Sequence, residues 1–544
     1  MRIENEKILL ISIDNPSAKV DIFIGFRKII VTFSVILRIY NYQFSIHPLE
    51  VQDLLKQYAA HPQVAALNTL LKNKTSRNIF LKGLNGSGTA MTIASLFSKR
   101  RGSYVCVLND LEDAGYFYHD LVQLTGGDGI YFFPSAYRRA IKYGHVDPAN
   151  EILRTEVLST LQDPTAPFII VTYPEALAEK VISREVLKEN TLKISVGERL
   201  DNMFVSDVLD EYGFEQVDYV YEPGQYAMRG SILDVFSFSY EFPYRIDFFG
   251  NEVETIRSFD VETQLSKEKL DSVYIVPEMT KGNRTNSSLL DSLPSETLLA
   301  SKDMAWVKER IGSIWNEEPI IGDEESFANI EQLRAKLITG EDFLHAALGF
   351  CRLHFGTRPM EVADATLTFS MEAQPIYHKN FDLVSESFHK YLEDGYTLYI
   401  LSDVEKQATR IRAIFEDRGD DIPFTSVNKT IHEGFADETL RVCLFTDHQL
   451  FDRFHKFNLK SDKARSGKLS LSLKELNQFT TGDYIVHIDH GVGQFGGLVR
   501  TEVNGKMQEA IRLIYQNNDI IFVSIHSLHK LSKYKGKDSG EPPK

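Results

Sequence analysis

The chain has 544 residues, of which 43% are hydrophobic and 25% are charged, and its formal net charge is −16. This length predicts several domains, since one domain usually takes about 100–200 residues. The acidic balance argues against a broad nucleic-acid-binding face, which needs clustered Lys and Arg. The three cysteines are far apart, so neither a disulfide framework nor a cysteine zinc site is indicated.

Residues 1–44 are predicted to be an extension before the first domain. The segment 22–40 is apolar but is interrupted by three basic residues. Its longest uninterrupted run, 29–37, is shorter than the ~20 residues that a membrane-spanning helix needs. We therefore expect no membrane partner, and either a β-rich hairpin or an irregular extension in this part of the chain.

From residue 45 to residue 174, segments typical of buried strands alternate with segments typical of helices. This alternation predicts a doubly wound parallel sheet. The predicted strands are 78–81, 104–108, 129–133 and 168–172, and the predicted helices are 49–58, 91–97, 110–124 and 149–161.

A glycine-rich segment, 83–90, follows the first predicted strand of this sheet and reads Gly-Leu-Asn-Gly-Ser-Gly-Thr-Ala. The P-loop pattern G-x-x-x-x-G-K-[ST] uses backbone N–H groups to hold phosphates, a lysine to reach them and a hydroxyl to bind Mg²⁺. Here threonine takes the lysine position and alanine the hydroxyl position, which predicts a degenerate phosphate loop that neither binds nor hydrolyses ATP. A chance glycine-rich turn is the alternative, because short motifs give false positives. The residues of the degenerate loop are Gly83, Gly86, Gly88, Thr89 and Ala90.

The next segment is acidic. Residues 201–264 contain 14 Asp or Glu, three Arg and no Lys, and short alternating strands such as 232–236 and 244–249 dominate them. We expect a compact α+β module, residues 175–264, whose few arginines are candidate partner contacts. The alternative is that these arginines form the weak ion pairs common at protein surfaces.

Residues 265–366 return to helices and short strands, and 367–455 form a further small α/β domain with helices at 381–393 and 404–417. A basic segment, 456–478, is expected to be a solvated linker, although basic linkers can contact nucleic acid.

The last module, 479–535, is predicted to be all β, with strands at 483–488, 497–502, 510–515 and 519–524. Short strands with glycine corners are typical of a small SH3-like barrel or curled sheet. His487, Asp489 and His490 could suggest a metal site, but such sites need three or four converging ligands. We therefore predict no metal and no catalytic residue here, and a polar tail at 536–544.

Two longer strings resemble one protein family. Residues 482–495 resemble the opening of the RNA-polymerase-interacting domain of bacterial transcription-repair coupling factors (Mfd), a module shared with CarD-type regulators. Residues 221–236 and 244–254 are similar to the UvrB-homology region of the same family. The resemblance covers residues 45–534 and leaves 1–44 without a counterpart.

The resemblance implies a multidomain α/β protein built on a degenerate, UvrB-like P-loop NTPase sheet with an inserted α+β module. The implied domains are 45–174 (UvrB domain 1a-like), 175–264 (UvrB domain 2-like and UvrA-binding), 265–366 (UvrB domain 1b-like), the small α/β domain 367–455 and the CarD-like, RNA-polymerase-interacting domain 479–535.

It also implies a function, that of the non-motor part of a coupling factor that binds stalled RNA polymerase and recruits UvrA for nucleotide excision repair. In the family, a separate translocase motor uses ATP and Mg²⁺ and contacts double-stranded DNA, and that motor would begin near where this chain ends. We expect no cofactor in this chain itself, a monomer, and a bacterial cytoplasmic location. The alternatives are a UvrB-like ATP-dependent helicase subunit, which an intact P-loop would have favoured, and a CarD-like transcription regulator.

By the same resemblance, Arg199, Arg229 and Phe236 should contact UvrA, two guanidinium groups beside one aromatic anchor. The alternative for Phe236 is a core position, because aromatic residues that end strands usually face inward.

The polymerase contact is expected where a partner strand from the β subunit adds to a sheet edge, at Val499, Arg500 and Thr501. Val499 and Thr501 should share one face of that strand and Arg500 the other.

Overall fold

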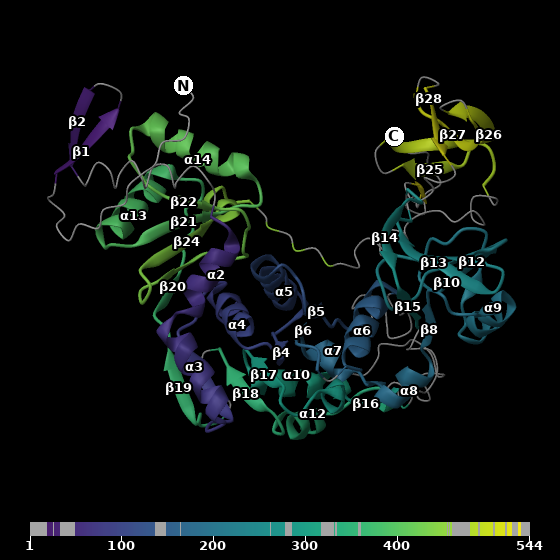
Figure 1. Ribbon diagram of the computed structural model, residues 1–544, viewed down its shortest axis with the longest axis horizontal. Helices are drawn as coiled ribbons and strands as arrows, with labels where there is room; N and C mark the ends of the chain where they lie inside the picture. Colours follow the sequence, from purple (N-terminus) through teal and green to yellow (C-terminus); the bar gives the residue numbers. More distant parts are fainter. Residues whose placement is uncertain are drawn as a thin grey trace.

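Two arms rise from a central base in the computed structural model (Figure 1). The structure describes residues 19–24, 27–32 and 49–534, apart from 137–147, 164, 262, 278–284, 317–330, 332–333, 357–358, 360, 454, 456, 458, 460–478, 488–489, 504–505, 517–518 and 525–530. The basic linker 456–478 and the polar tail 536–544 therefore lie mostly or wholly outside the described residues. Within the described part of the chain, none of the helices has the length and apolarity to cross a bilayer.

The base is a seven-stranded sheet of order β19-β3-β18-β17-β4-β6-β5, in which every neighbouring pair is parallel. Its inner strands are continuous apolar runs that are buried, as expected where helices cover both faces of a sheet. The strands are β3 (Asn78–Lys82), β4 (Ser103–Val107), β5 (Ile130–Phe132), β6 (Phe168–Thr172), β17 (Leu298–Ser301), β18 (Cys351–His354) and β19 (Ala365–Thr368). The predicted parallel sheet is confirmed, and the segments 45–174 and 265–366 build it together.

The helices of the base follow local capping chemistry. At the start of α5, the Asp110 carboxylate accepts the N–H groups of Glu112 and Asp113 at 2.9 and 3.0 Å, and the helix ends at Gly126, whose φ of +84° suits glycine. The helices are α2 (Val51–Ala59), α3 (Pro62–Asn73), α4 (Gly88–Lys99), α5 (Leu111–Thr125), α6 (Pro148–Thr160), α7 (Pro174–Ala178), α8 (Arg184–Glu189), α10 (Met304–Asn316) and α12 (Gly340–Ala347).

The right-hand arm in Figure 1 begins with the acidic module, which is inserted between β6 and β17. Its six-stranded sheet has the order β14-β13-β12-β11-β10-β9, and β15 pairs with β8 beside it. The predicted boundary at residue 264 falls before β14 and β15, so the module runs from β8 to β15. Its elements are β8 (Leu192–Ser195), α9 (Asn202–Glu211), β9 (Glu215–Gln216), β10 (Gln225–Arg229), β11 (Ile232–Val235), β12 (Tyr244–Phe249), β13 (Glu252–Phe259), β14 (Ser266–Leu270) and β15 (Ser272–Ile275).

The left-hand arm is the predicted small α/β domain, a five-stranded sheet of order β20-β23-β24-β21-β22. One hydrophobic core runs from the parallel sheet of the base into this domain, where Leu401, Phe435 and Leu444 belong to it. The elements are β20 (Met371–Ala373), α13 (Phe381–Glu393), β21 (Thr397–Leu401), α14 (Glu405–Arg418), β22 (Thr425–Val427), β23 (Phe435–Asp437), β24 (Val442–Thr446) and α15 (Asp447–Leu450).

The chain continues into a five-stranded antiparallel sheet of order β28-β27-β26-β25-β29, at the top of the right-hand arm. Its strands are β25 (Tyr484–His487), β26 (Gly491–Val503), β27 (Lys506–Ile514), β28 (Ile520–Ser524) and β29 (Leu531–Lys533). In the N-terminal extension, β1 (Lys19–Ile24) and β2 (Arg27–Thr32) form an antiparallel pair.

Candidate binding surfaces and a filled phosphate loop

The degenerate phosphate loop, residues 83–90, lies where a P-loop belongs, between β3 and α4. Two glycines shape it, because Gly83 and Gly86 have φ angles of +84° and +51°. The small α/β domain contacts this loop directly through backbone groups. Asn85 donates its side-chain N–H to the Met371 carbonyl at 2.6 Å, and the Ser87 N–H donates to the Glu433 carbonyl at 3.1 Å.

Peptide and side-chain atoms fill the space that a phosphate would take. A Cβ added at Gly88 would lie 2.5 Å from the Met371 sulfur, and one added at Gly86 would lie 2.8 Å from the Gly434 carbonyl oxygen. Thr89 and Ala90, at the lysine and hydroxyl positions, are buried. The loop therefore does not fit a nucleotide, for it lacks both the charge and the room.

Asp120 of α5 also helps to hold the small α/β domain against the phosphate loop. It accepts the His432 N–H at 2.7 Å, and the Ser87 hydroxyl accepts the neighbouring Glu433 N–H at 2.9 Å. Burial raises the pKa of the Asp120 carboxyl to about 7. The phosphate loop and the segment before β23 are thus held together by several hydrogen bonds.

In the acidic module, Arg229 forms contacts within the protein itself. Its guanidinium group pairs with the buried Asp234 carboxylate and donates to the Asp218 carbonyl at 2.8 Å. Arg245 holds the same carboxylate at 2.7 Å, so Asp234 keeps a partner if Arg229 changes. No pattern in the sequence indicates that Arg229, the last residue of β10, lies beside a buried carboxylate.

Phe236 is not a surface residue. Its side chain is 1% exposed and packs with Ile152, Val220 and Ala227 in a small core cluster. The expectation that Phe236 contacts UvrA from the surface is therefore wrong in this structure, and the alternative, a core position, is what the strand geometry produces.

Arg199 is exposed and lies at one end of the six-stranded sheet. It bridges to Glu252, where the β12–β13 turn ends, and its side chain is 84% exposed with only a long ion pair of 3.7 Å. Arg229 reaches the same end, because the turn that follows it bonds to β12 through the Phe248 N–H and the Ser231 carbonyl at 2.8 Å.

Three apolar side chains that the sequence reasoning missed gather at this end. Phe249 is 79% exposed at the end of β12, and Met203 and Phe204 are exposed at the start of α9. The Leu200 N–H bonds to the Asn251 carbonyl at 2.8 Å, which brings the start of α9 to the β12–β13 turn.

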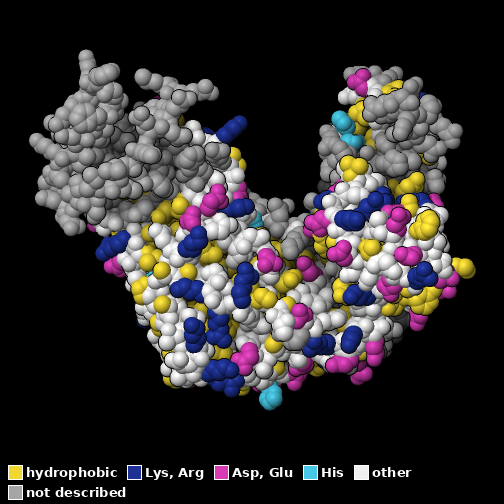
Figure 2. All heavy atoms as spheres, in the orientation of Figure 1, with side chains coloured by type: hydrophobic (Ala, Val, Ile, Leu, Met, Phe, Trp, Pro, Cys, Tyr) yellow, Lys and Arg dark blue, Asp and Glu magenta, His cyan; other side chains and the backbone are white. Residues whose placement is uncertain are grey.

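Side chains of this kind protrude at the right-hand edge in Figure 2, where Figure 1 places α9 and β12. We call the group Arg199, Met203, Phe204 and Phe249 the end patch. The exposure of one phenylalanine at the end of β12 was predictable from the sequence, because the successive residues Phe248 and Phe249 of a strand must face opposite ways.

In the last module, β26 is longer than its neighbour β25. β25 pairs only with Gly491 to Gln494 of β26, whereas β27 pairs with 498–503 from the other side. Among the described residues no strand pairs with the free side of 498–503, so this part of β26 is a sheet edge. The predicted contact residues Val499, Arg500 and Thr501 all lie on it, after a bulge at Gly496 and Gly497. Val499 is half-buried, and the side chains of Arg500 and Thr501 lie outside the described part.

Comparison with known proteins adds two domains to this description. The family described as the UvrB interaction domain matches residues 192–280, and the CarD-like/TRCF RID domain matches residues 479–535. The chain is also similar to curated proteins called transcription-repair-coupling factor.

The relative from Staphylococcus aureus (strain bovine RF122 / ET3-1) is 22% identical over 547 residues, which is 86% of this chain and 46% of the relative. The relative from Bacillus subtilis (strain 168) is 22% identical, over 85% of this chain and 45% of the relative. The chain spans about half the length of these proteins. By both domain matches and the long alignments, the chain is similar to about half of these transcription-repair-coupling factors, and it carries matches to a UvrB interaction domain and a CarD-like/TRCF RID domain.

Proposed function

We propose that this chain is the binding part of a transcription-repair coupling factor, which joins stalled RNA polymerase to the excision-repair protein UvrA in the bacterial cytoplasm. The observation that carries the proposal is the presence of a UvrB interaction domain and a CarD-like/TRCF RID domain in one chain. A CarD-like regulator would not need the first of these domains, and a UvrB-like helicase subunit would need a working phosphate loop.

The end patch is the surface that fits UvrA. Protein interfaces draw most of their binding energy from a few aromatic and arginine residues, and the end patch offers Phe204, Phe249 and Arg199 together. Arg229 contributes from the same end, and Phe249 takes the role of aromatic anchor that the resemblance assigned to Phe236.

The free edge of β26 is the surface that fits RNA polymerase. An exposed strand edge offers unpaired N–H and C=O groups, to which a strand of the β subunit can add with main-chain hydrogen bonds. Val499, Arg500 and Thr501 lie on this edge. The contact is therefore made by the backbone, while the side chains set the register.

ATP has no place in this part of the protein. The filled phosphate loop supports a scaffold that neither binds nor hydrolyses nucleotide, with ATP, Mg²⁺ and double-stranded DNA handled by a motor elsewhere in the longer family members. We propose that the chain acts as a monomer, with one UvrA surface and one polymerase surface.

The test is a binding experiment with the full chain immobilised and with core RNA polymerase and UvrA added separately and then in sequence. Each protein should bind alone, and the second should add to the complex of the first without displacing it. Failure to bind either protein would reject the proposed function, and displacement would show that the two surfaces overlap.

A further inference from the structure

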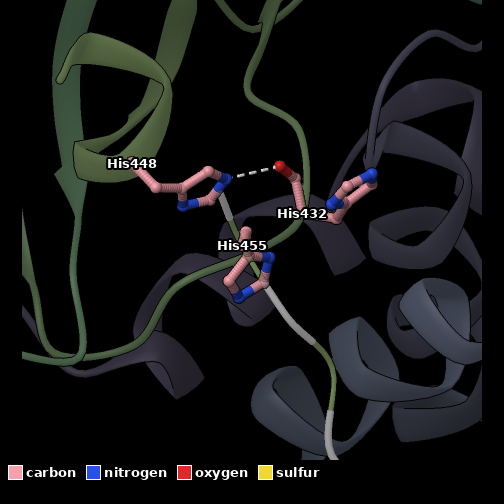
Figure 3. A group of neighbouring side chains, drawn as sticks. All are labelled: His432, His448 and His455. Carbon is pink, nitrogen blue, oxygen red and sulfur yellow. Dashed lines mark hydrogen bonds between the residues drawn. The ribbon is translucent and has the colours of Figure 1, made fainter. Parts of the chain in front are cut away.

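Three histidines gather where the small α/β domain meets α5, away from both proposed binding surfaces (Figure 3). His448 comes from the short helix α15, His432 from the segment before β23, and His455 from the chain that follows α15. One ring nitrogen from each lies within 4.8 Å of those of the other two.

The hydrogen bonds decide where the proton of one ring sits. His448 donates its Nε2–H to the His432 carbonyl at 2.7 Å, and Figure 3 shows that this nitrogen, not Nδ1, lies on the side of the ring that faces His432. A metal ion bound at Nε2 would take the place of this proton, so the hydrogen bond to the His432 carbonyl must be exchanged for the metal bond.

The other two rings carry buried nitrogens with no partner. His432 Nδ1 and His455 Nδ1 are shielded from solvent, and neither has a hydrogen-bond partner among the described residues. Burial lowers the pKa of His432 to about 4 and that of His455 to about 3, and it also lowers the pKa of His448. Imidazole binds a metal in its neutral form, through the lone pair of a ring nitrogen.

Ring stacking alone is the competing explanation. The rings of His448 and His455 lie 4.3 Å apart and nearly parallel, and His432 stacks on Tyr116 at 3.6 Å. Stacking accounts for the packing of these rings but gives no donor to the two orphaned nitrogens, and a buried polar atom without a partner costs stability.

We propose that His432, His448 and His455 bind one divalent transition-metal ion, with Zn²⁺ as the first candidate and a water molecule as the fourth ligand. Three neutral imidazoles with one open position are a ligand set that suits Zn²⁺. Zn–N bonds of about 2.0–2.1 Å require nitrogens roughly 3.4 Å apart, so the three rings must close in and the His448–His455 stack must tilt open.

The position of the site gives the ion a structural role. His432 directly precedes Glu433 and Gly434, the two residues whose carbonyl oxygens lie against the phosphate loop. A metal bound by His432, His448 and His455 would fix the segment 432–434, which fills the phosphate loop and is called the filling segment below, to the end of the small α/β domain.

The experiment uses the full chain, stripped with a chelator and titrated with Zn²⁺ by calorimetry and with Co²⁺ by visible absorption. Wild-type protein should bind about one equivalent of Zn²⁺ and should show the d–d bands of tetrahedral Co²⁺. His448→Gln and His455→Gln should each weaken binding at least tenfold, because losing a ligand costs more than losing an outer partner, which already costs 10–100-fold.

Two further variants separate coordination from packing. His389→Gln, an exposed histidine of α13, should leave metal binding unchanged. His455→Cys should restore binding relative to His455→Gln and should add a thiolate-to-cobalt charge-transfer band, since cysteine is also a zinc ligand. Wild-type protein that binds no more Zn²⁺ than His448→Gln, or a His389→Gln variant that loses the ion, would overturn the proposal.

Discussion

His354 ends strand β18 inside the base, where it is only 3% exposed and its Nε2 has no hydrogen-bond partner among the described residues. Burial, with the nearby Arg352 charge, lowers its pKa from 6.5 to about 4. The unfolded chain therefore takes up a proton between these two pH values and the folded chain does not. His354 consequently adds stability that is present above about pH 6.5 and is lost as the pH falls toward 4.

We predict that acidification from pH 7 to pH 5 costs the base about 2 kcal/mol through His354 alone. His354→Gln should remove that part of the pH dependence, while other buried histidines keep theirs. Urea unfolding of both proteins at pH 7, 6 and 5 measures the difference. Equal slopes against pH for the two proteins would show that His354 is not held neutral.

Phe249 is the residue on which the proposed UvrA surface depends most. Phe249→Ala should weaken UvrA binding by about 2 kcal/mol or more, a factor of roughly 30 in Kd, because exposed aromatics at interfaces are frequent hot spots. Its melting temperature should not change, since the side chain is 79% exposed.

The matched control is Tyr274→Ala, which removes an exposed aromatic of β15 on the same module but outside the end patch. Both variants are compared with wild type by calorimetric titration of UvrA. Should Tyr274→Ala weaken binding and Phe249→Ala leave it intact, the UvrA surface lies along β8 and β15 instead.

At the scale of the strand, successive N–H groups of β26 point alternately toward β27 and toward the free edge. Of the neighbours Arg500 and Thr501, one therefore donates inward and the other outward. Proline at the inward position breaks the ladder with β27, whereas proline at the outward position removes only a donor to a partner strand.

We therefore predict different outcomes for Arg500→Pro and Thr501→Pro. One should lower the melting temperature of the module, and the other should keep the fold and lose RNA polymerase binding. UvrA binding should persist in the variant that stays folded. Calorimetry measures the melting temperature of each variant, and co-elution measures its binding to polymerase. If both proline variants fold and both still bind polymerase, strand addition does not occur at this edge.

The elements themselves were largely predictable, because their signals are local. The buried runs at 104–108 and 168–172 and the Asp110 cap before α5 are readable from a few neighbouring residues. The burial of single side chains was less predictable. Alternation alone does not tell which face of β11 meets a second core, and for that reason the contact role of Phe236 was wrong.

Long-range contacts could not be predicted from the sequence. The missing lysine and hydroxyl predicted an inactive phosphate loop, but nothing in residues 83–90 indicates that Met371 and Gly434, about 300 positions away, fill it. The three histidines likewise come from separate segments with no ligand spacing, so no motif could have gathered them.

At the scale of the whole molecule, the filled phosphate loop predicts that rebuilding the P-loop sequence does not create ATP binding. Thr89→Lys with Ala90→Ser rebuilds the P-loop pattern, but both side chains would enter buried space. The double variant should still fail to bind Mg-ATP in calorimetry at near-millimolar concentration. It should also lose stability by a few kcal/mol, because a buried lysine without a partner is costly.

Ala90→Ser alone serves as the control for the smaller change. It should be close to wild type in stability and equally unable to bind nucleotide. Micromolar binding of Mg-ATP by the double variant would mean that the filling segment is displaced easily.

The shared core between the base and the small α/β domain has a mechanical consequence. In a two-lobed ATPase the lobes separate and close as nucleotide enters and leaves, and that movement generates force. Here the same seam is held closed by the Met371 thioether, backbone hydrogen bonds and common apolar packing, all of which oppose the entry of a nucleotide. We therefore expect this seam to stay closed, so that a pull applied to the small α/β domain is passed to the base.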